Sequence, residues 1–223
     1  KQSAAIGLNS IALGTSNLAT GESSVALGDS SKAVAKDAIA IGRNGNASGE
    51  QAISIGAGAQ AAASGALAAG GASNAGRDGA VALGQGAFAN TTAGISIGQN
   101  AGAGTSQGTT NDRTDHIAIG HNSGQNVIGN RNIALGVGAG SNLSASGIGS
   151  SDDNIAIGVN AGSNLNGDDN IAIGRDANKN ITAVAESVAI GSRVDATTGS
   201  TVLGYEAKAS GGDYATVLGY KAK

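Results

Sequence analysis

The chain has 223 residues and a formal net charge of −3, with one Phe, three Tyr and no Trp, Met, Cys or Pro. The shortage of aromatic residues excludes an ordinary globular core, which takes much of its buried area from aromatic side chains. The net negative charge gives no broad cationic field, so we expect no nucleic acid partner and no binding to anionic lipid.

A short strand pattern recurs through the first half of the chain. In the stretch 37–42, Ile39 and Ile41 alternate with Ala38 and Ala40, and Gly42 closes the run. Alternation with a period of two and β-branched residues predicts a strand. Copies follow at a fixed step of 14 residues, which indicates a repeat architecture. They begin at Ile11, Val25, Ile39, Ile53, Leu67, Val81 and Ile95.

One period, residues 39–52, is read as two strands and two turns. A strand over 38–42 is followed by a turn at 43–45, a weaker strand over 46–48 and a second turn at 49–51. Asn and Gly in these turns tolerate positive φ. Such a period predicts one coil of a parallel β-solenoid, an all-β fold in which each coil hydrogen-bonds to the next.

The pattern loosens after Gly98. Further copies are read as coils of 16 residues, with six-residue insertions near 105–115 and 144–153 that are rich in Gly, Ser, Thr, Asn and Asp and should be surface loops. We expect one domain, with regular repeats over 1–98 and a continuation of the same solenoid over 99–223. The later copies begin at Ile117, Ile133, Ile155, Ile171, Val188, Thr201 and Thr216.

Neither face of these strands carries charge, so both faces should be buried. Two buried aliphatic side chains contribute about 3–6 kcal/mol per coil, whereas ordering 14 residues costs about 14–28 kcal/mol. A stack of coils therefore needs a partner, and other copies of the chain are the natural one. We expect the Ile pairs to fill the coil and Ala to face the oligomer axis. The expected core residues are Ile39, Ile41, Ile53, Ile55, Ile95, Ile97, Ile117, Ile119, Ile155, Ile157, Ile171 and Ile173.

Two copies of the repeat carry a family resemblance. The stretches 170–174 (Asn-Ile-Ala-Ile-Gly) and 187–191 (Ser-Val-Ala-Ile-Gly) resemble the Asn-Ser-Val-Ala-Ile-Gly repeat of trimeric autotransporter adhesin heads, the YadA-like heads. The 14-residue spacing is similar, and so are Ser31, Ala33 and Ala35 in the second half of the repeat.

The resemblance implies a left-handed parallel β-roll in a homotrimer on the surface of a Gram-negative bacterium. It implies a non-catalytic virulence adhesin that attaches to host cells or to matrix proteins such as collagen, fibronectin and laminin. We find no neck connector, coiled-coil heptads or membrane anchor in these residues. This stretch is therefore not expected to insert in a membrane, and attachment to the outer membrane would use regions outside it.

Basic residues at the turns are candidate ligand contacts. Arg43 and Arg175 follow the Gly that ends a strand, and Arg193 lies one place further. Together with Lys32 and Lys36 they could form an outer stripe that meets a ligand. The alternative is that these charges keep the β-surface soluble. Tyr205, Tyr214 and Tyr220 are expected to cluster in the last coils.

Other side chains were considered for metal binding and catalysis. His116 and His121 could form a metal site with Asp112 or Asp115, but too few ligands are present and solvated loop residues are preferred. The pairs Asp152-Asp153 and Asp168-Asp169 could bind calcium, although turn formation by Asp side chains is the better interpretation. We expect no cofactor and no metal.

Two alternative functions were weighed against adhesion. An ice-binding or purely structural β-solenoid is the first, but ice-binding faces need regular Thr rows and Thr is irregular here, at 91–92, 109–110 and 197–198. An enzyme is the second, since left-handed β-helices include acyltransferases with a six-residue period. The chain has neither that period nor a G-x-S-x-G motif or P-loop, so we expect no catalysis.

Overall fold

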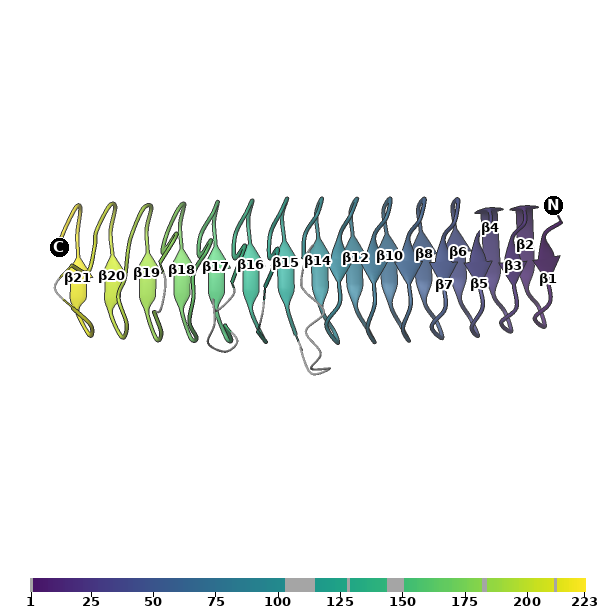
Figure 1. The fold of residues 1–223 in the computed structure, drawn as a ribbon, viewed down its shortest axis with the longest axis horizontal. Helices are drawn as coiled ribbons and strands as arrows, with labels where there is room; N and C mark the ends of the chain where they lie inside the picture. Colours follow the sequence, from purple (N-terminus) through teal and green to yellow (C-terminus); the bar gives the residue numbers. More distant parts are fainter. Residues whose placement is uncertain (1, 103–114, 128, 144–150, 182–183, 211) are drawn as a thin grey trace. The chain divides into compact units, whose positions relative to one another are not determined.

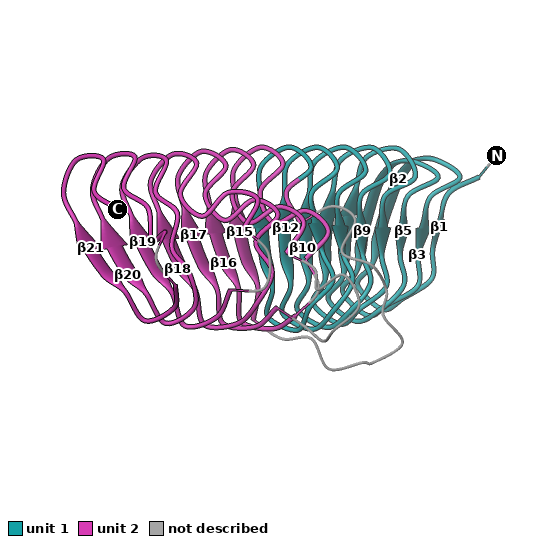
Figure 2. Cartoon of the chain, turned by 60° about the vertical axis from the view of Figure 1, so that its left-hand side comes forward, with its two compact units in different colours: residues 1–100 teal, residues 101–223 magenta. Residues whose placement is uncertain are grey.

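The fold was analysed in a computed structural model, which describes residues 2–102, 115–127, 129–143, 151–181, 184–210 and 212–223. The chain divides into two compact units, unit 1 (Lys1–Asn100) and unit 2 (Ala101–Lys223), coloured separately in Figure 2. The regular elements of the described residues are all β-strands. Among these residues, no helix has the length and apolar character needed to cross a membrane.

Unit 1 contains two parallel sheets that alternate along the chain. Every strand pairs with the strand 14 residues away, as Ile39 pairs with Ile53, so the 14-residue coil of the predicted parallel solenoid is confirmed (Figure 1). The longer strands are β2 (Ile11–Thr15), β4 (Val25–Asp29), β6 (Ile39–Ile41), β8 (Ile53–Ile55), β10 (Leu67–Ala69), β12 (Val81–Leu83) and β14 (Ile95–Ile97). The shorter strands are β1 (Ala4–Ala5), β3 (Leu18–Ala19), β5 (Lys32–Ala33), β7 (Asn46–Ala47), β9 (Gln60–Ala61), β11 (Asn74–Ala75) and β13 (Phe88–Ala89).

Unit 2 forms one parallel sheet with longer returns between its strands. Ile117 pairs with Ile133 and Ile155 pairs with Ile171, which are the expected 16-residue steps. Residues 105–114 and 144–150, where insertions were predicted, lie outside the described residues. The strands are β15 (Ile117–Ile119), β16 (Ile133–Leu135), β17 (Ile155–Ile157), β18 (Ile171–Ile173), β19 (Val188–Ile190), β20 (Thr201–Leu203) and β21 (Thr216–Leu218).

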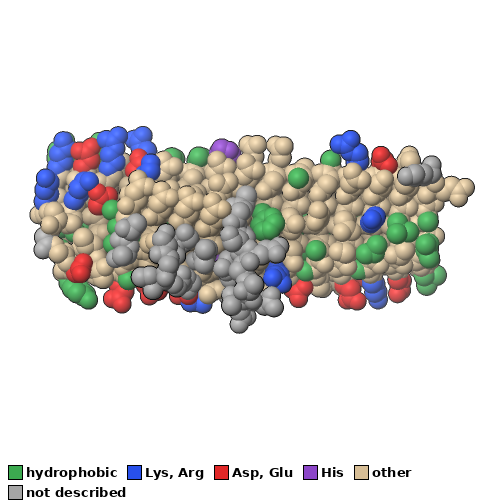
Figure 3. Space-filling view, viewed as in Figure 1, with side chains coloured by type: hydrophobic (Ala, Val, Ile, Leu, Met, Phe, Trp, Pro, Cys, Tyr) green, Lys and Arg blue, Asp and Glu red, His purple; other side chains and the backbone are tan. Residues whose placement is uncertain are grey.

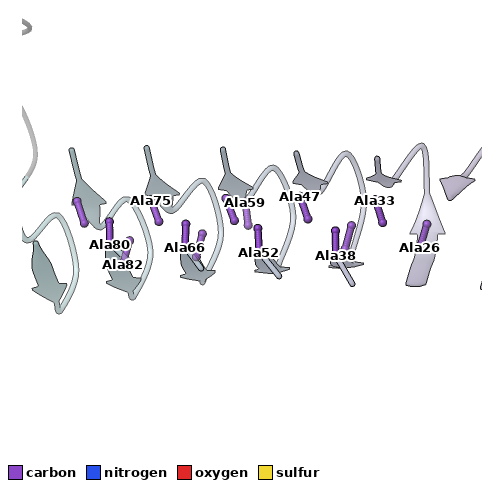
Figure 4. Packing of buried hydrophobic residues seen from close by; sticks show 14 of the residues in the cluster. Ala26, Ala33, Ala38, Ala47, Ala52, Ala59, Ala66, Ala75, Ala80 and Ala82 are labelled. Carbon is purple, nitrogen blue, oxygen red and sulfur yellow. The ribbon is translucent and has the colours of Figure 1, made fainter. Parts of the chain in front are cut away.

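The interior of the unit 1 coils is built from alanine and serine, which corrects the expectation that the Ile pairs fill it. In β6 the middle residue, Ala40, is fully buried, while Ile39 is partly exposed and Ile41 is exposed. Figure 4 shows Ala side chains from successive coils pointing into the same interior. The buried cluster includes Ala26, Ala33, Ala38, Ala40, Ala47, Ala52, Ala59, Ala61, Ala66, Ala68, Ala75, Ala80, Ala82 and Ala87.

The correction extends to both units. In β17 and β18 the middle residues Ala156 and Ala172 are buried, whereas the flanking Ile side chains point outward. The physical reason is the width of the coil. In unit 1, two short legs joined by tight turns leave room for little more than a Cβ atom, and a branched Ile side chain would be overpacked. In unit 2 the first and third residues of the strands also point outward, but the middle position of β20 and β21 buries a larger side chain, Val202 or Val217.

Glycine at the end of each long strand lets the coils approach closely. Gly42 has φ of 125°, and a Cβ built on it would lie 2.6 Å from the carbonyl oxygen of Gly56. A side chain at this position would therefore clash with the backbone of the next coil. Gly42 also donates its N–H to the carbonyl oxygen of Leu27 at 2.8 Å, which ties it to the preceding coil.

The larger coils of unit 2 hold larger side chains. Leu143 and Leu165 are fully buried and cluster with Val127 and Val184. A column of buried Asn residues, each preceding a strand, adds hydrogen bonds between coils. Asn154 donates its side-chain amide to the Gly167 carbonyl oxygen at 2.9 Å, and its own side-chain oxygen accepts the N–H of Asn170 at 3.0 Å. These contacts satisfy polar groups that the wider interior would otherwise leave unpaired.

The alanine interior predicts a sharp size limit at Ala68, the buried middle residue of β10. Ala68→Leu should lower the free energy of unfolding by about 3 kcal/mol, because no adjacent space can take the added atoms. Denaturant unfolding measures the effect. Ala62→Leu is the matched control, since Ala62 is exposed in the preceding coil and should tolerate leucine. Equal stability of the two variants would show that the interior is not closely packed.

Candidate functional site

The outward side of the long strands in unit 1 is aliphatic. In the three-residue strands the first and third residues point away from the buried middle residue, and the register stacks Ile39 on Ile53 and Ile41 on Ile55. We call these two columns, with their counterparts in unit 2, the aliphatic face. In unit 1 the columns are Ile11, Val25, Ile39, Ile53, Leu67, Val81 and Ile95, and Leu13, Leu27, Ile41, Ile55, Ala69, Leu83 and Ile97.

Unit 2 repeats this arrangement on strands β15 to β21. Ile117 stacks on Ile133 and Ile119 stacks on Leu135, and the columns continue to the last strand. Thr201 and Thr216 are the polar members of the first column. The columns are Ile117, Ile133, Ile155, Ile171, Val188, Thr201 and Thr216, and Ile119, Leu135, Ile157, Ile173, Ile190, Leu203 and Leu218.

The aliphatic face is open to solvent in the single chain. Ile41 is 36% exposed, Ile55 is 42% exposed and Leu218 is 72% exposed, and no position of the columns is charged. Parallel sheets are normally covered on both sides, and continuous exposed apolar surfaces mark interaction sites. Apart from Thr201 and Thr216 the columns are aliphatic, and such a face can bury apolar surface against a partner.

The predicted basic contacts of unit 1 do not form one stripe. Lys36 lies in the turn before β6 and its Nζ atom is 4.0 Å from the Glu22 carboxylate. Arg43 lies in the turn after β6, at the other end of the strand, and is exposed. Lys32 is exposed on β5, the short strand that precedes the turn containing Lys36. A role of these residues in ligand contact stays a prediction.

In unit 2 the structure brings Arg175 and Arg193 together. Arg193 donates its backbone N–H to the Arg175 carbonyl oxygen at 2.8 Å, so the two residues occupy the same edge in successive coils. The Arg193 guanidinium then lies 3.0 Å from a carboxylate oxygen of Glu206 in the following coil. Ligand contact by Arg175 and Arg193 also stays a prediction.

The two histidines have different surroundings: His116 contacts backbone groups, and His121 is exposed to solvent. His116 Nε2 lies 2.6 Å from the Gly129 carbonyl oxygen, and the Asn132 N–H points to His116 Nδ1 at 3.4 Å. His121 is exposed after β15. Of the two residues proposed as third ligand, Asp112 lies outside the described residues and Asp115 is exposed. In the described part of the chain, no group of three or more His, Cys, Asp or Glu side chains could hold a metal.

The Asp pairs connect neighbouring turns. The Asp152 carboxylate accepts the N–H of Asn130 at 2.8 Å, and the Asp168 carboxylate accepts the N–H of Asp152 at 2.8 Å. Asp153 pairs with Arg131 at 2.6 Å, and this contact lowers the Asp153 pKa. These contacts join one coil to another, so they do not show the side-chain turns within one coil that the sequence predicted.

The structure brings two of the three C-terminal tyrosines together. The rings of Tyr205 and Tyr220 are stacked with centroids 5.7 Å apart. Tyr214 lies in the turn before β21 and is largely exposed. The sequence reasoning missed that Lys208, Lys221 and Lys223 line one hollow and that Lys221 lies over the Tyr220 ring. The signal was a recurring Tyr followed by charged residues at 205–208 and 220–223.

Comparison with known proteins finds one family. Four stretches of the chain, residues 5–31, 19–44, 78–101 and 198–222, match the model of the YadA head domain repeat, which comprises two copies of the repeat. The matches fall in both units. None of the curated proteins matches the chain.

The contact with Arg193 predicts a lowered pKa for the Glu206 carboxyl group. The hydrogen bond from Arg193 lowers the Glu206 pKa from its usual 4.5. Because the folded-state pKa is lowered, the contact stabilises the fold above the unfolded-state pKa, and this contribution is lost as the pH falls through the lowered value. Carboxyl NMR titration should show the Glu206 pKa rising in Arg193→Ala and unchanged in Arg131→Ala. An unchanged value in Arg193→Ala would contradict the contact.

Proposed function

Since this chain is a YadA-like head domain, we propose that it is the non-catalytic attachment module of a bacterial cell-surface adhesin and that it works as a homotrimer. In this proposal the outer membrane attachment is made by regions outside these residues. The targets are host cells or matrix proteins of the collagen, fibronectin and laminin class.

The observation that carries the trimer is the aliphatic face. It runs along the long strands of each unit without a charged residue, and its Ile41 and Ile55 side chains remain partly in water in the single chain. The coil interior of unit 1 cannot supply much stabilisation, because it buries mostly Ala. Burial of the outward Ile, Val and Leu side chains against a partner supplies the stabilisation that the interior does not provide.

Other copies of the same chain are the partner that fits this face. A second copy presents the same repeat, so aliphatic columns meet aliphatic columns along the length of each unit. Three sheets that face a common axis form a closed cyclic assembly in which each copy covers its face. The turns and shorter legs then remain outside, where a target can reach them.

Attachment is favoured by repetition. Three copies present each surface feature three times, and a matrix protein with repeated sequence can engage several of them at once. Simultaneous contacts raise the overall affinity without strengthening any single contact.

The trimer predicts a specific response to charge on the aliphatic face. The wild-type chain should have three times the 21.1 kDa mass of one chain in multi-angle light scattering. The double substitution Ile41→Asp with Ile55→Asp should shift the protein to monomer, because burying unpaired carboxylates is unfavourable.

The matched control uses the opposite leg of the same part of unit 1. Val34 is 37% exposed, close to the exposure of Ile41, and lies on the outer side of its coil. Ser48 occupies the equivalent position in the next coil. Val34→Asp with Ser48→Asp should remain trimeric. A monomeric wild-type chain, or a trimer that survives the Ile substitutions, would contradict the proposed assembly.

Attachment is tested by retention on separate surfaces coated with collagen, fibronectin, laminin and serum albumin. The wild-type trimer should bind at least one matrix protein and not albumin. The monomeric Ile41→Asp, Ile55→Asp variant should bind the same surface roughly 100-fold more weakly, because avidity is lost. Absence of retention on every matrix protein and on host cells would refute adhesion.

A further inference from the structure

The turns that follow β19, β20 and β21 enclose a basic hollow. It has a volume of about 600 Å³ and is lined by Arg193, Glu206, Lys208, Lys221 and Lys223. Four of the five lining residues are cationic, although the chain as a whole has a net charge of −3. In Figure 3 the Lys and Arg side chains gather over these last coils, at the left of the view. The hollow is thus a local concentration of positive charge.

The repeat itself positions these cations. Arg193, Glu206 and Lys221 occupy the same turn position in three successive coils, each with positive φ. The backbone N–H of Glu206 bonds to Ser192, and that of Lys221 bonds to Tyr205. Successive coils lie about 4.8 Å apart, so the three side chains form a short column. Glu206 holds both neighbours, at 3.0 Å from Arg193 and 3.5 Å from Lys221.

Positive charge remains in excess after these pairs are formed. Lys208 pairs with Asp195 at 2.5 Å, and Glu206 is shared between two cations. Lys223 forms no ion pair within the described ranges of the chain. A concave surface with excess charge of one sign concentrates ligands of the opposite sign. The hollow therefore suits an anionic ligand.

Aromatic surface lies next to the cations. Tyr205 and Tyr220 stack with an angle of 6° between their rings, and both are exposed. The Lys221 Nζ atom is 5.1 Å from the centre of the Tyr220 ring. A ligand that carries both negative groups and a flat apolar ring surface would use both features.

We propose that this basic hollow binds a sulfated polysaccharide, with sulfate groups on Lys208, Lys221, Lys223 and Arg193 and a sugar ring against the exposed tyrosines. A linear polyanion carries its charges along its length, as the hollow carries its cations along successive coils. The choice of a polysaccharide rests on the proposed function, because an adhesin head meets the polysaccharides of host surfaces.

Single-stranded nucleic acid fits the hollow less well. Proteins that bind single strands stack successive bases on separate aromatic side chains. Here the two tyrosines stack on each other, so their inner faces are occupied and no row of stacking surfaces is available. The phosphate groups alone would then have to provide the binding.

The test uses the whole chain and three probes: a heparin hexasaccharide, the unsulfated hexasaccharide of the same backbone, and a 20-nucleotide oligothymidine. Affinity is measured by calorimetry at two salt concentrations. The heparin fragment should bind, more weakly at the higher salt, and the other two should not. Lys208→Ala with Lys221→Ala should weaken heparin binding roughly tenfold or more.

The matched control is Arg77→Ala with Arg131→Ala, which removes the same charge at exposed turns outside the hollow and should bind heparin as the wild type does. Heparin binding that is absent, or equally reduced in both variants, would overturn the proposal. Equal binding of oligothymidine would overturn the assignment to sulfated polysaccharide. The mass of the protein in solution is measured in the same samples. A monomer that binds heparin would refute the proposed trimer but not the ligand of the hollow. A trimer that fails to bind heparin would refute the ligand of the hollow but not the trimer.

Discussion

The narrow interior of the coil is the constraint on which the rest of the structure depends. In unit 1 two short legs and two tight turns enclose space for little more than a methyl group, and Ala40, Ala47, Ala52 and Ser54 fill it. Because larger side chains do not fit, the Ile, Val and Leu side chains of the long strands must point outward. Unit 1 thus places its small residues inside and its large apolar residues on the surface, the reverse of an ordinary domain.

This inversion connects folding with assembly. A coil that buries mostly alanine gains little stability from its own interior. Its aliphatic columns are exposed to water, and this exposure is unfavourable. Association of copies through these columns would supply the missing burial. The strand-ending glycines serve the same architecture, since Gly42 allows the backbones of neighbouring coils to approach where any side chain would clash.

Unit 2 shows how the same repeat accommodates variation. Where the coil lengthens to 16 residues, the added space holds Leu143 and Leu165, and buried Asn154 and Asn170 connect successive coils by side-chain hydrogen bonds. Where the coil shortens again near the last strands, charged residues and tyrosines stack in columns at the turns. A periodic scaffold therefore aligns any side chain with its counterpart in the next coil, and this alignment turns Lys208, Lys221 and Lys223 into a local basic surface.

The sequence by itself determined the strands, the parallel register and the coil length, because a period of 14 residues leaves one way to align successive copies. The 16-residue step was also readable from spacing. The sequence did not determine which face of the strand lies inside the coil, since Ile39 and Ala40 alternate without a charged residue to mark the solvent side. Only closure of the coil decided this, through its width. Tertiary structure also separated Lys36 from Arg43 and gathered the C-terminal lysines, because the distance between turns depends on how the chain returns between strands.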